Sequence, residues 1–360
     1  MSELIRQNRL NLNKSPALSL TQHVKVVMAK LLDQTVDHGV SQIIQSGNQW
    51  AWDLYKKSLN AHWSPFEAPM SEDIRQWKDG FISDDEKLLV KRILGLFSAG
   101  ESLVSNSIFS VERKYLTDGC VRQYLGKKDF EEQLHNATVA VCCESYGFDV
   151  REVAEAYKSI PSVRKKTRFL KESLDSFEKD FDISTTEGKI AFVRNLYIVY
   201  MLMEGVWFFS AFCAIMSLGR QKKLPGLYFQ IDYTIADETR HVEFGARIIN
   251  QIKEEYPKIW TKELREDLSR LTEEAISLEI DFVKDALPNG LLGINAYSHE
   301  LYAKFLASRR MSSVGLVPLY SEVANPYGWI SETQGASVLT NFFEATVRDY
   351  QSASALDDDF

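Results

Sequence analysis

The sequence predicts an all-α protein that folds as a helix bundle. Long stretches of the 360 residues have the apolar spacing and the end signals of helices. Strand signals are few, because the chain has no sustained alternation of polar and apolar residues and no Asn-Gly turn between β-branched segments. Two Glu-x-x-His tetrads, Glu132–His135 and Glu238–His241, lie inside such helical stretches. One large helical core therefore accounts for the chain better than several small domains.

We expect three segments along the chain. Residues 1–48 are mixed and polar, which is typical of an arm that wraps the body or a partner. Residues 49–325 carry the helical pattern, and no linker divides them. Residues 326–360 form a C-terminal segment, and its last part, from Tyr350 to Phe360, is rich in Ser and Ala and closes with Leu-Asp-Asp-Asp-Phe. Such a composition cannot form a core, so a mobile tail is predicted.

The first helix that can be recognised clearly begins at Ser83. The sequence Ser-Asp-Asp-Glu from this residue is a capping box ahead of an apolar pattern, and the helix carries Glu101. The next helix is predicted over residues 128–146, carries the first tetrad and ends at Gly147. A charged stretch over residues 163–180 follows, and we expect it to be a solvated helix or loop.

A long apolar helix is predicted from Lys189 to Leu218. It carries Glu204 and is followed by Gly219, a residue suited to a left-handed helix cap. Residues 196–218 have Glu204 as their only charge, so they are long and apolar enough to span a membrane. A helix buried on all sides in a bundle has the same composition. We favour the buried helix, because there is no second span and no flanking asymmetry of Lys and Arg.

Three more helices complete the predicted bundle. One begins after Pro225, carries the second tetrad and reaches about Glu255, shortly before Pro257. The other two are predicted over Lys262–Ala286 and Ala296–Arg310.

Charge and cysteine usage narrow the classes of function. Lys and Arg number 42 against 50 Asp and Glu, which gives a net charge of −8, and no basic patch is present. Nucleic acid is therefore not expected as a partner. The four cysteines include no Cys-x-x-Cys pair, and no secretory segment opens the chain. These features predict a reduced, cytoplasmic protein.

The tetrads predict a metal centre. Residues three apart on a helix lie on one face, so each tetrad directs a carboxylate and an imidazole toward the same place. Glu101 and Glu204 interrupt apolar runs, where an unpaired carboxylate would be costly. Ferritin-like dimetal proteins take one Glu from each of two helices and Glu-x-x-His from each of two others. The sequence therefore predicts a ferritin-like helical bundle with extra helices that holds a dinuclear site with these ligands: Glu101, Glu132, His135, Glu204, Glu238 and His241.

Simpler interpretations of single residues remain open at this point. A helical Glu is most often a surface residue, as we expect for Glu131, Glu144 and Glu243, and a lone buried His is often a satisfied core residue. As a set, four carboxylates and two imidazoles suit Fe or Mn, and the lack of thiolates argues against a structural zinc. Two such metals, bridged by glutamates, could bind O2 between them and cleave it.

These residues give the chain its resemblance to a known family. From about Trp63 to its C-terminus, the chain resembles the small, radical-generating subunit of class I ribonucleotide reductase. The resemblance rests on the six candidate ligands, on the sequence Met-Glu-Gly-Val-Trp-Phe-Phe around Glu204, on Asp237 before the second tetrad, on Asn-Pro-x-x-Trp-Ile over residues 325–330, and on the tail from Tyr350.

The resemblance implies roles for further residues. Family members use a buried Trp, an Asp and a metal-ligating His to pass an electron between the metal site and the subunit interface, and Trp63, Asp237 and His135 match these positions. Plain core packing is the other interpretation of Trp63. Tyr350 would relay the radical to the large catalytic subunit, where the final residues would dock, unless it is an incidental aromatic of the tail. The family also implies a homodimer whose oxidant reversibly oxidises a cysteine of the large subunit and so starts ribonucleotide reduction.

Two departures from the common family pattern point to one subclass. Val139 stands where most members have the radical-bearing Tyr, and an aliphatic side chain has no oxidisable O–H. Glu101 stands where the common pattern has Asp. Both resemble the Chlamydia-like subclass that lacks a tyrosyl radical, in which a Mn/Fe pair stores the oxidant. Tyr233 fits that subclass's branch for delivering an electron during assembly. Ligand types alone do not separate Mn from Fe, so a di-iron centre stays open.

Two other functions compete with this one. Ligand-binding Mn/Fe oxidases of the same superfamily also lack the radical Tyr and use Glu as the first ligand, but they lack a docking tail such as Tyr350–Phe360. A ferritin-like storage protein would have a much shorter chain and would assemble into a cage. Both fit the sequence less well than the reductase subunit.

Overall fold

The computed structural model describes most of the chain: residues 30–36, 43, 46–178 and 182–332. These residues form helices and no strand, and a single bridge among them pairs Leu291 with Ile294. The predicted all-α fold is confirmed. Most of the expected N-terminal arm, and the tail with Tyr350, lie outside the described residues.

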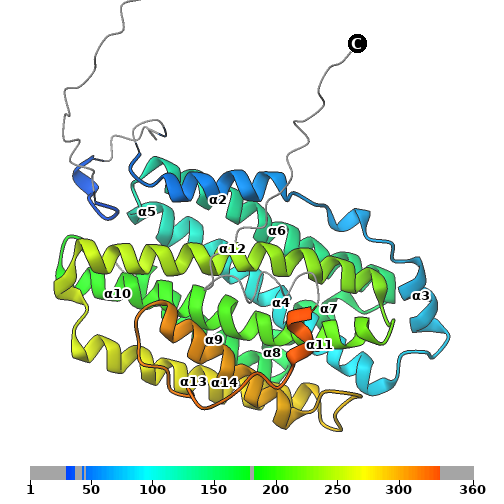
Figure 1. Cartoon of the computed structure of the whole chain (residues 1–360). Helices are drawn as coiled ribbons and strands as arrows, with labels where there is room; N and C mark the ends of the chain where they lie inside the picture. Colours follow the sequence, from blue (N-terminus) through cyan, green and yellow to red (C-terminus); the bar gives the residue numbers. More distant parts are fainter. Residues whose placement is uncertain (1–29, 37–42, 44–45, 179–181, 333–360) are drawn as a thin grey trace, which may run out of the picture.

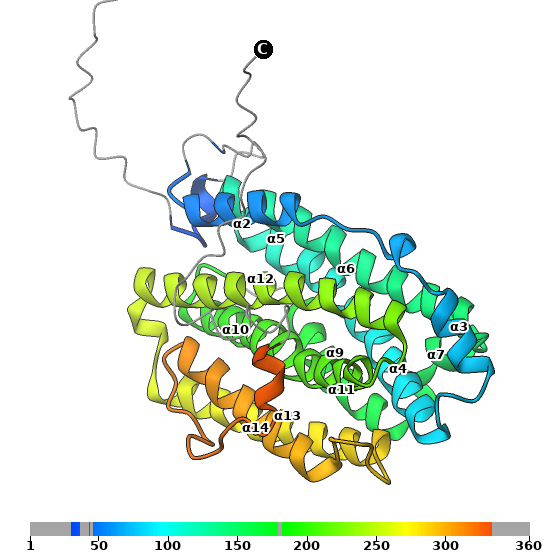
Figure 2. The same ribbon diagram turned by 45° about the vertical axis from the view of Figure 1, so that its right-hand side comes forward.

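Four long helical segments surround the centre of the bundle: α4 (Asp84–Ser107), α6 (Gly119–Tyr146), η4 (Tyr197–Phe208) and α12 (Pro225–Glu255). α4 packs along α6, and α12 packs along η4. In Figures 1 and 2, α2 (Gln49–Asn60) lies with α6 on one side of α12, and α13 (Lys262–Ala286) lies with α14 (Ala296–Ser313) on the other. The bundle is thus thicker than four helices alone would be.

Shorter helices and helical turns connect and extend this core. The α-helices among them are α3 (Ser71–Lys78), α5 (Arg113–Tyr115), α7 (Val150–Ala154), α8 (Ala156–Ser159) and α9 (Pro161–Glu178). The helical turns are η1 (Gln34–Val36), η2 (Pro65–Glu67), η3 (Ile108–Glu112), η5 (Pro257–Ile259) and η6 (Gly328–Glu332).

One continuous helix runs from Thr186 to Arg220 and supplies the most buried part of the core. It consists of α10 (Thr186–Leu196), the π-helical segment η4 and α11 (Phe209–Arg220). The helix is long and apolar enough to cross a membrane, but its most apolar window is wholly buried inside the bundle. Its composition therefore matches that of a core helix. π-Helical turns are rare and often occur at functional sites, and η4 carries Glu204.

Several predicted helix ends are confirmed. The Ser83 hydroxyl accepts a hydrogen bond from the Glu86 backbone N–H at 3.3 Å, and the Glu86 carboxylate accepts one from the Ser83 N–H at 2.9 Å. Gly147 ends α6 with a left-handed φ of 69°. α6 begins earlier than predicted, at Gly119, because the Asp118 side chain caps its first turn.

The prediction for Gly219 is wrong. The helix continues to Arg220, and the positive φ values that follow its end belong to Lys222 and Leu224. Gly219 instead allows α12 to approach, because a Cβ at this position would lie 2.0 Å from Cδ2 of Tyr228. A glycine after an apolar run therefore marks a close helix contact here.

The charged stretch after residue 163 forms α9 and is less solvated than expected. Val163, Lys166 and Leu170 are buried on one face of this helix. The Lys166 ammonium donates a hydrogen bond to the Glu279 carboxylate on α13. A buried charge needs such a partner, and the pairing explains why a charged segment can lie in the core.

Gly245→Ala is expected to destabilise the fold. A Cβ at Gly245 on α12 would lie 2.2 Å from Cγ of Tyr200 on η4, so two helices that carry candidate ligands would have to separate. Overpacking of this kind costs about 1–3 kcal/mol, and the denaturation midpoint should fall. Gly126→Ala is the matched control, because its nearest neighbour would be an Arg113 side-chain nitrogen at 3.4 Å. Equal midpoints for the two variants would contradict this packing.

Candidate metal centre

The structure brings all six predicted ligand residues to the centre of the bundle. Glu101 comes from α4, the first tetrad from α6, Glu204 from η4 and the second tetrad from α12. Each of the six is at most 2% exposed. Four separate helical segments thus direct acidic and imidazole side chains into a volume from which solvent is excluded.

The donor atoms form two groups that share Glu132. One group consists of Glu101, Glu132, His135 and Glu238, and the other of Glu132, Glu204 and His241, with the donor atoms of each group within 4.8 Å of one another. Nδ1 of His135 lies 3.4 Å from Glu101 Oε2 and 3.2 Å from Glu238 Oε1. Nδ1 of His241 lies 3.1 Å from Glu132 Oε1 and 3.3 Å from Glu238 Oε2. Glu238 therefore faces both imidazoles.

The inward-facing donor atoms fit a pair of metal ions. Buried polar atoms in proteins nearly always have hydrogen-bond partners. Within the described part of the chain, seven atoms of the six residues have none: Glu101 Oε2, Glu132 Oε2, His135 Nδ1, Glu204 Oε2, both Glu238 carboxylate oxygens and His241 Nδ1. Oxygen and imidazole donors without partners, converging on two points, are what hard-to-borderline divalent metals require.

The electrostatics of the site favour added positive charge. Burial raises the pKa of Glu101 and of Glu204 well above the usual value for a carboxyl group. Burial would also raise the pKa of Glu132, but the charges of Lys128 and His241 hold it well below that value. Burial acts against a charged His135, yet the Glu101 carboxylate and other neighbours raise the pKa of this imidazole well above its usual value. Buried carboxylates thus attract whatever cation is available.

An outer hydrogen-bond network orients His135. Asp237 Oδ2 lies 3.3 Å from His135 Nε2 and accepts a hydrogen bond from Trp63 Nε1 at 2.7 Å. Arg240 donates to the other Asp237 oxygen. Burial opposes ionisation of Asp237, but its hydrogen bond with His135 and the Arg240 charge lower its pKa to about 2. The carboxylate can therefore hold the His135 Nε2–H and leave Nδ1 for a metal.

Trp63 connects this network to an exposed tyrosine. Its side chain is 3% exposed, and its ring lies 6.4 Å from the His135 ring and 5.5 Å from the Tyr233 ring, both stacked. Tyr233 is 38% exposed. Trp63, Asp237, His135 and Tyr233 are thus neighbouring side chains in one series.

Glu131 contacts Nε2 of His241, as Asp237 contacts Nε2 of His135. The prediction that Glu131 lies at the surface is wrong. It is 1% exposed, and its Oε2 lies 3.0 Å from His241 Nε2. Lys127 donates to its other oxygen at 2.8 Å. Glu144 is exposed, as expected, and Glu243 is half-buried. The four-residue spacing from Glu131 to His135 could have revealed that Glu131 faces the site.

Glu131→Gln is expected to weaken metal binding. The amide cannot carry the negative charge that makes His241 a stronger donor, and loss of such outer partners reduces metal affinity by roughly 10- to 100-fold. Competition for Mn²⁺ against a chelator measures the change. Glu144→Gln, on the exposed face of the same helix, is the control. Unchanged affinity in Glu131→Gln would show that the contact with His241 does not tune the site.

Lys128 is the second residue of the site that the sequence did not reveal. Its side chain is fully buried, and its ammonium donates to Glu132 Oε1 at 2.6 Å and to Glu204 Oε1 at 2.8 Å. Burial opposes its charge, but these carboxylates raise the pKa of Lys128 above its usual value. The four-residue spacing to Glu132 is visible in the sequence, but lysines are rarely buried.

Val139 lies one helical turn after His135 and is 6% exposed. It occupies the inner side of α6, so the side chain at this position faces the core. Tyr200, on η4, is fully buried and donates a hydrogen bond to Glu112. Phenols are therefore present in the core, both on η4 and on α6 itself, where Tyr124 is fully buried.

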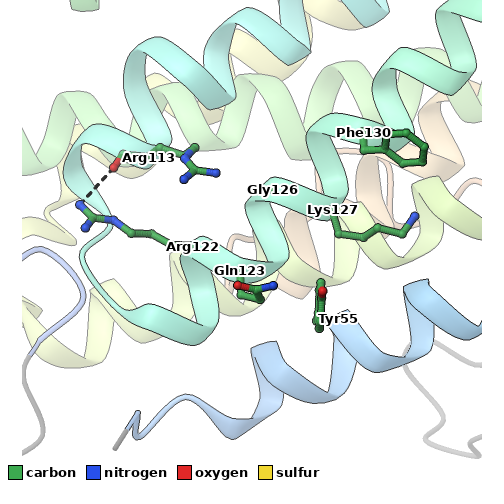
Figure 3. Close-up of a pocket in the computed structure, with 7 residues that line it drawn as sticks. All are labelled: Tyr55, Arg113, Arg122, Gln123, Gly126, Lys127 and Phe130. Carbon is green, nitrogen blue, oxygen red and sulfur yellow. Dashed lines mark hydrogen bonds between the residues drawn. The ribbon is translucent and has the colours of Figure 1, made fainter. Parts of the chain in front are cut away.

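A surface pocket lies beside α6 near Lys127 (Figure 3). Its volume is about 360 Å³, and it is lined by Tyr55 from α2, by Arg113 from α5 and by these residues of α6: Arg122, Gln123, Gly126, Lys127 and Phe130. Arg122 donates to the Arg113 backbone carbonyl at 3.2 Å. Lys127 lines the pocket and also donates a hydrogen bond to Glu131, the residue that contacts His241.

Curated proteins of one family resemble this chain along most of its length. The family model "Ribonucleotide reductase, small chain" matches residues 41–326. The chain is 40% identical to the ribonucleoside-diphosphate reductase subunit beta of Chlamydia pneumoniae over 88% of this chain and 92% of that protein. It is 28% identical to the ribonucleoside-diphosphate reductase small chain of Nicotiana tabacum over 85% of this chain and 86% of that protein.

Solved structures share the fold. The ribonucleotide reductase R2 subunit from Clostridium botulinum superposes with a TM-score of 0.78 at 24% identity, and the match covers 84% of this chain and 93% of that one. An R2-like ligand-binding oxidase with a reconstituted Mn/Fe cofactor has a TM-score of 0.63 at 20% identity, with 77% and 99% covered. The family match and the 40% identical relative show that the chain belongs to the ribonucleotide reductase small chain family, whose members are components of an oxidoreductase.

Proposed function

We propose that the chain is the small subunit of a ribonucleoside-diphosphate reductase and that it holds a dinuclear metal centre. The observation that carries this proposal is the pair of donor groups that share Glu132, with partnerless donor atoms directed at both. The ligands would be Glu101, Glu132, His135 and Glu238 for one metal, and Glu132, Glu204 and His241 for the other. The bound metals would supply a stored one-electron oxidant.

Other residues of the chain would orient this centre and would transfer electrons to and from it. Asp237 and Glu131 would fix the two imidazoles through their Nε2 atoms. Trp63 would carry an electron between the subunit interface and His135, and the Asp237 carboxylate would stabilise positive charge that develops on the indole. Tyr233, stacked on Trp63, would deliver an electron during assembly.

We propose a Mn/Fe pair, with Fe/Fe as the alternative outcome of metal analysis. Val139 offers no oxidisable O–H next to the site, so the oxidant would stay on the metals. Glu101 stands where the common family pattern has Asp, which is one methylene shorter, and this departure supports the same subclass. The donor set itself suits either metal.

The partners follow from the same proposal. The tail from Tyr350 to Phe360 would dock the large catalytic subunit, and Tyr350 would pass the radical to a cysteine there. The subunit would act as a cytoplasmic homodimer that uses O2 to build its oxidant. Nucleotide binding and the reducing thiols would belong to the large subunit.

Mixing the metal-loaded protein with its cognate large subunit tests this function. Reduction of a ribonucleoside diphosphate should require both proteins and should be lost when the chain is shortened to end at residue 349. The shortened chain should keep its metals, which separates docking from cofactor assembly. Failure of the full-length pair to form deoxyribonucleotide would contradict the proposal, and a copurifying fatty-acid-like ligand would favour an R2-like oxidase.

A further inference from the structure

Lys128 makes more hydrogen bonds to one donor group than to the other. Its ammonium bonds to Glu132, which both groups share, and to Glu204, which belongs only to the group with His241. The ammonium also lies over the Tyr200 ring, 4.9 Å from its centroid. A fixed positive charge therefore stands beside the Glu204–His241 group and bonds to two of its three members.

A metal ion in that group and the Lys128 ammonium would share the same two carboxylates, because Lys128 bonds to one oxygen of each while the other oxygen has no partner. The two cations would also repel each other, and charges interact strongly where water is excluded. When ionised to bind metal, the four glutamates bring four negative charges to the site, and Lys128 cancels one. A first divalent ion then leaves the donor set slightly negative, whereas a second leaves it positive.

We propose that Lys128 makes metal loading stepwise. The donor group of Glu101, Glu132, His135 and Glu238 would fill first, and the group of Glu132, Glu204 and His241 would bind its metal more weakly. This inference rests on the proposed dinuclear centre. Lys128 is a positioning residue in this account, because it acts through the carboxylates it holds. Unequal affinities would allow metals of two kinds to enter at different concentrations, which is one way to build a mixed pair.

Glu112 would be an alternative carboxylate for the ammonium when a second metal enters. It is fully buried, accepts a hydrogen bond from the Tyr200 hydroxyl and is close enough for its charge to act on Lys128. A buried ammonium without a carboxylate would be costly, so Glu112 lowers the cost of moving Lys128 away from Glu204. Glu112→Gln should therefore weaken the second binding step further.

Titration of the full-length, metal-free chain with Mn²⁺ in the absence of O2 tests the proposal. Free Mn²⁺ is followed by its EPR signal, which gives a binding isotherm without any activity assay. The wild-type isotherm should show two steps whose dissociation constants differ by at least about 10-fold, or about 1.4 kcal/mol. Lys128→Met should tighten the second step by about 10-fold or more and leave the first nearly unchanged.

Two further variants keep the result interpretable. Lys128→Gln removes the charge but keeps a hydrogen-bond donor, so it should also tighten the second step and serves if the Met variant fails to fold. Lys166→Met removes another fully buried lysine, whose carboxylate partner Glu279 belongs to neither donor group, and should leave both steps unchanged.

The outcomes separate this inference from the function on which it rests. Two equal steps in the wild type, or an unchanged or weaker second step in both Lys128 variants, would overturn the role of Lys128 while leaving the dinuclear centre intact. Absence of Mn²⁺ and Fe²⁺ binding in the folded wild type would instead overturn the proposed centre itself.

Discussion

Glu132→Ala is expected to lose both metals and nearly all activity with the large subunit. Glu132 belongs to both donor groups, so its removal takes a ligand from each metal. It also removes one of the two carboxylates to which the buried Lys128 donates hydrogen bonds. Activity should fall by at least about 100-fold, because loss of even an outer partner costs roughly 10- to 100-fold.

Metal content per chain and ribonucleotide reduction measure this effect. Glu144→Ala is the matched control, since Glu144 is an exposed glutamate on the same helix. The control should keep its metals and its activity. Two metals bound to folded Glu132→Ala would show that the shared carboxylate is dispensable and would contradict the ligand assignment.

Tyr350→Phe is expected to abolish ribonucleotide reduction while cofactor assembly stays intact. Phenylalanine keeps the aromatic ring for docking but has no O–H that can be oxidised, so a radical relay through this position would stop. The variant should load the same metals as the wild type and should bind the large subunit with similar affinity. Activity, metal content and binding to the large subunit are measured on the same preparation.

Tyr297→Phe serves as the control for this prediction. Tyr297 is 70% exposed at the start of α14 and takes no part in the proposed path. Its variant should retain full activity. Normal turnover in Tyr350→Phe would refute the relay role, whereas lost binding to the large subunit would assign the residue to docking instead.

Helices whose ends carry local signals could be predicted from the sequence. The Ser83 capping box and Gly147 define their helix ends through local hydrogen bonds and backbone conformation, and both can be recognised from a few residues. The role of Gly219 could not, because it depends on Tyr228, which packs against it from α12. The π-helical form of η4 could not be predicted either, since nothing in its apolar sequence distinguishes π from α geometry.

The predicted ligands come together because helical spacing constrains them strongly. Glu132 and His135 must share a face of α6, and a lone glutamate such as Glu204 in an apolar run has few tolerable partners. Lys128 and Glu131 escaped prediction because general preference places Lys and Glu at the surface. Their four-residue spacings to predicted ligands are visible in the sequence, but the packing of α6 within the bundle decides that both side chains are buried.

Metal analysis combined with EPR on the full-length chain from aerobically grown cells tests the central claim most directly. The account predicts a dinuclear centre containing Mn and Fe and no tyrosyl radical signal, because Val139 leaves the oxidant on the metals. A homogeneous di-iron centre, or a tyrosyl radical on Tyr200 or Tyr233, would contradict it.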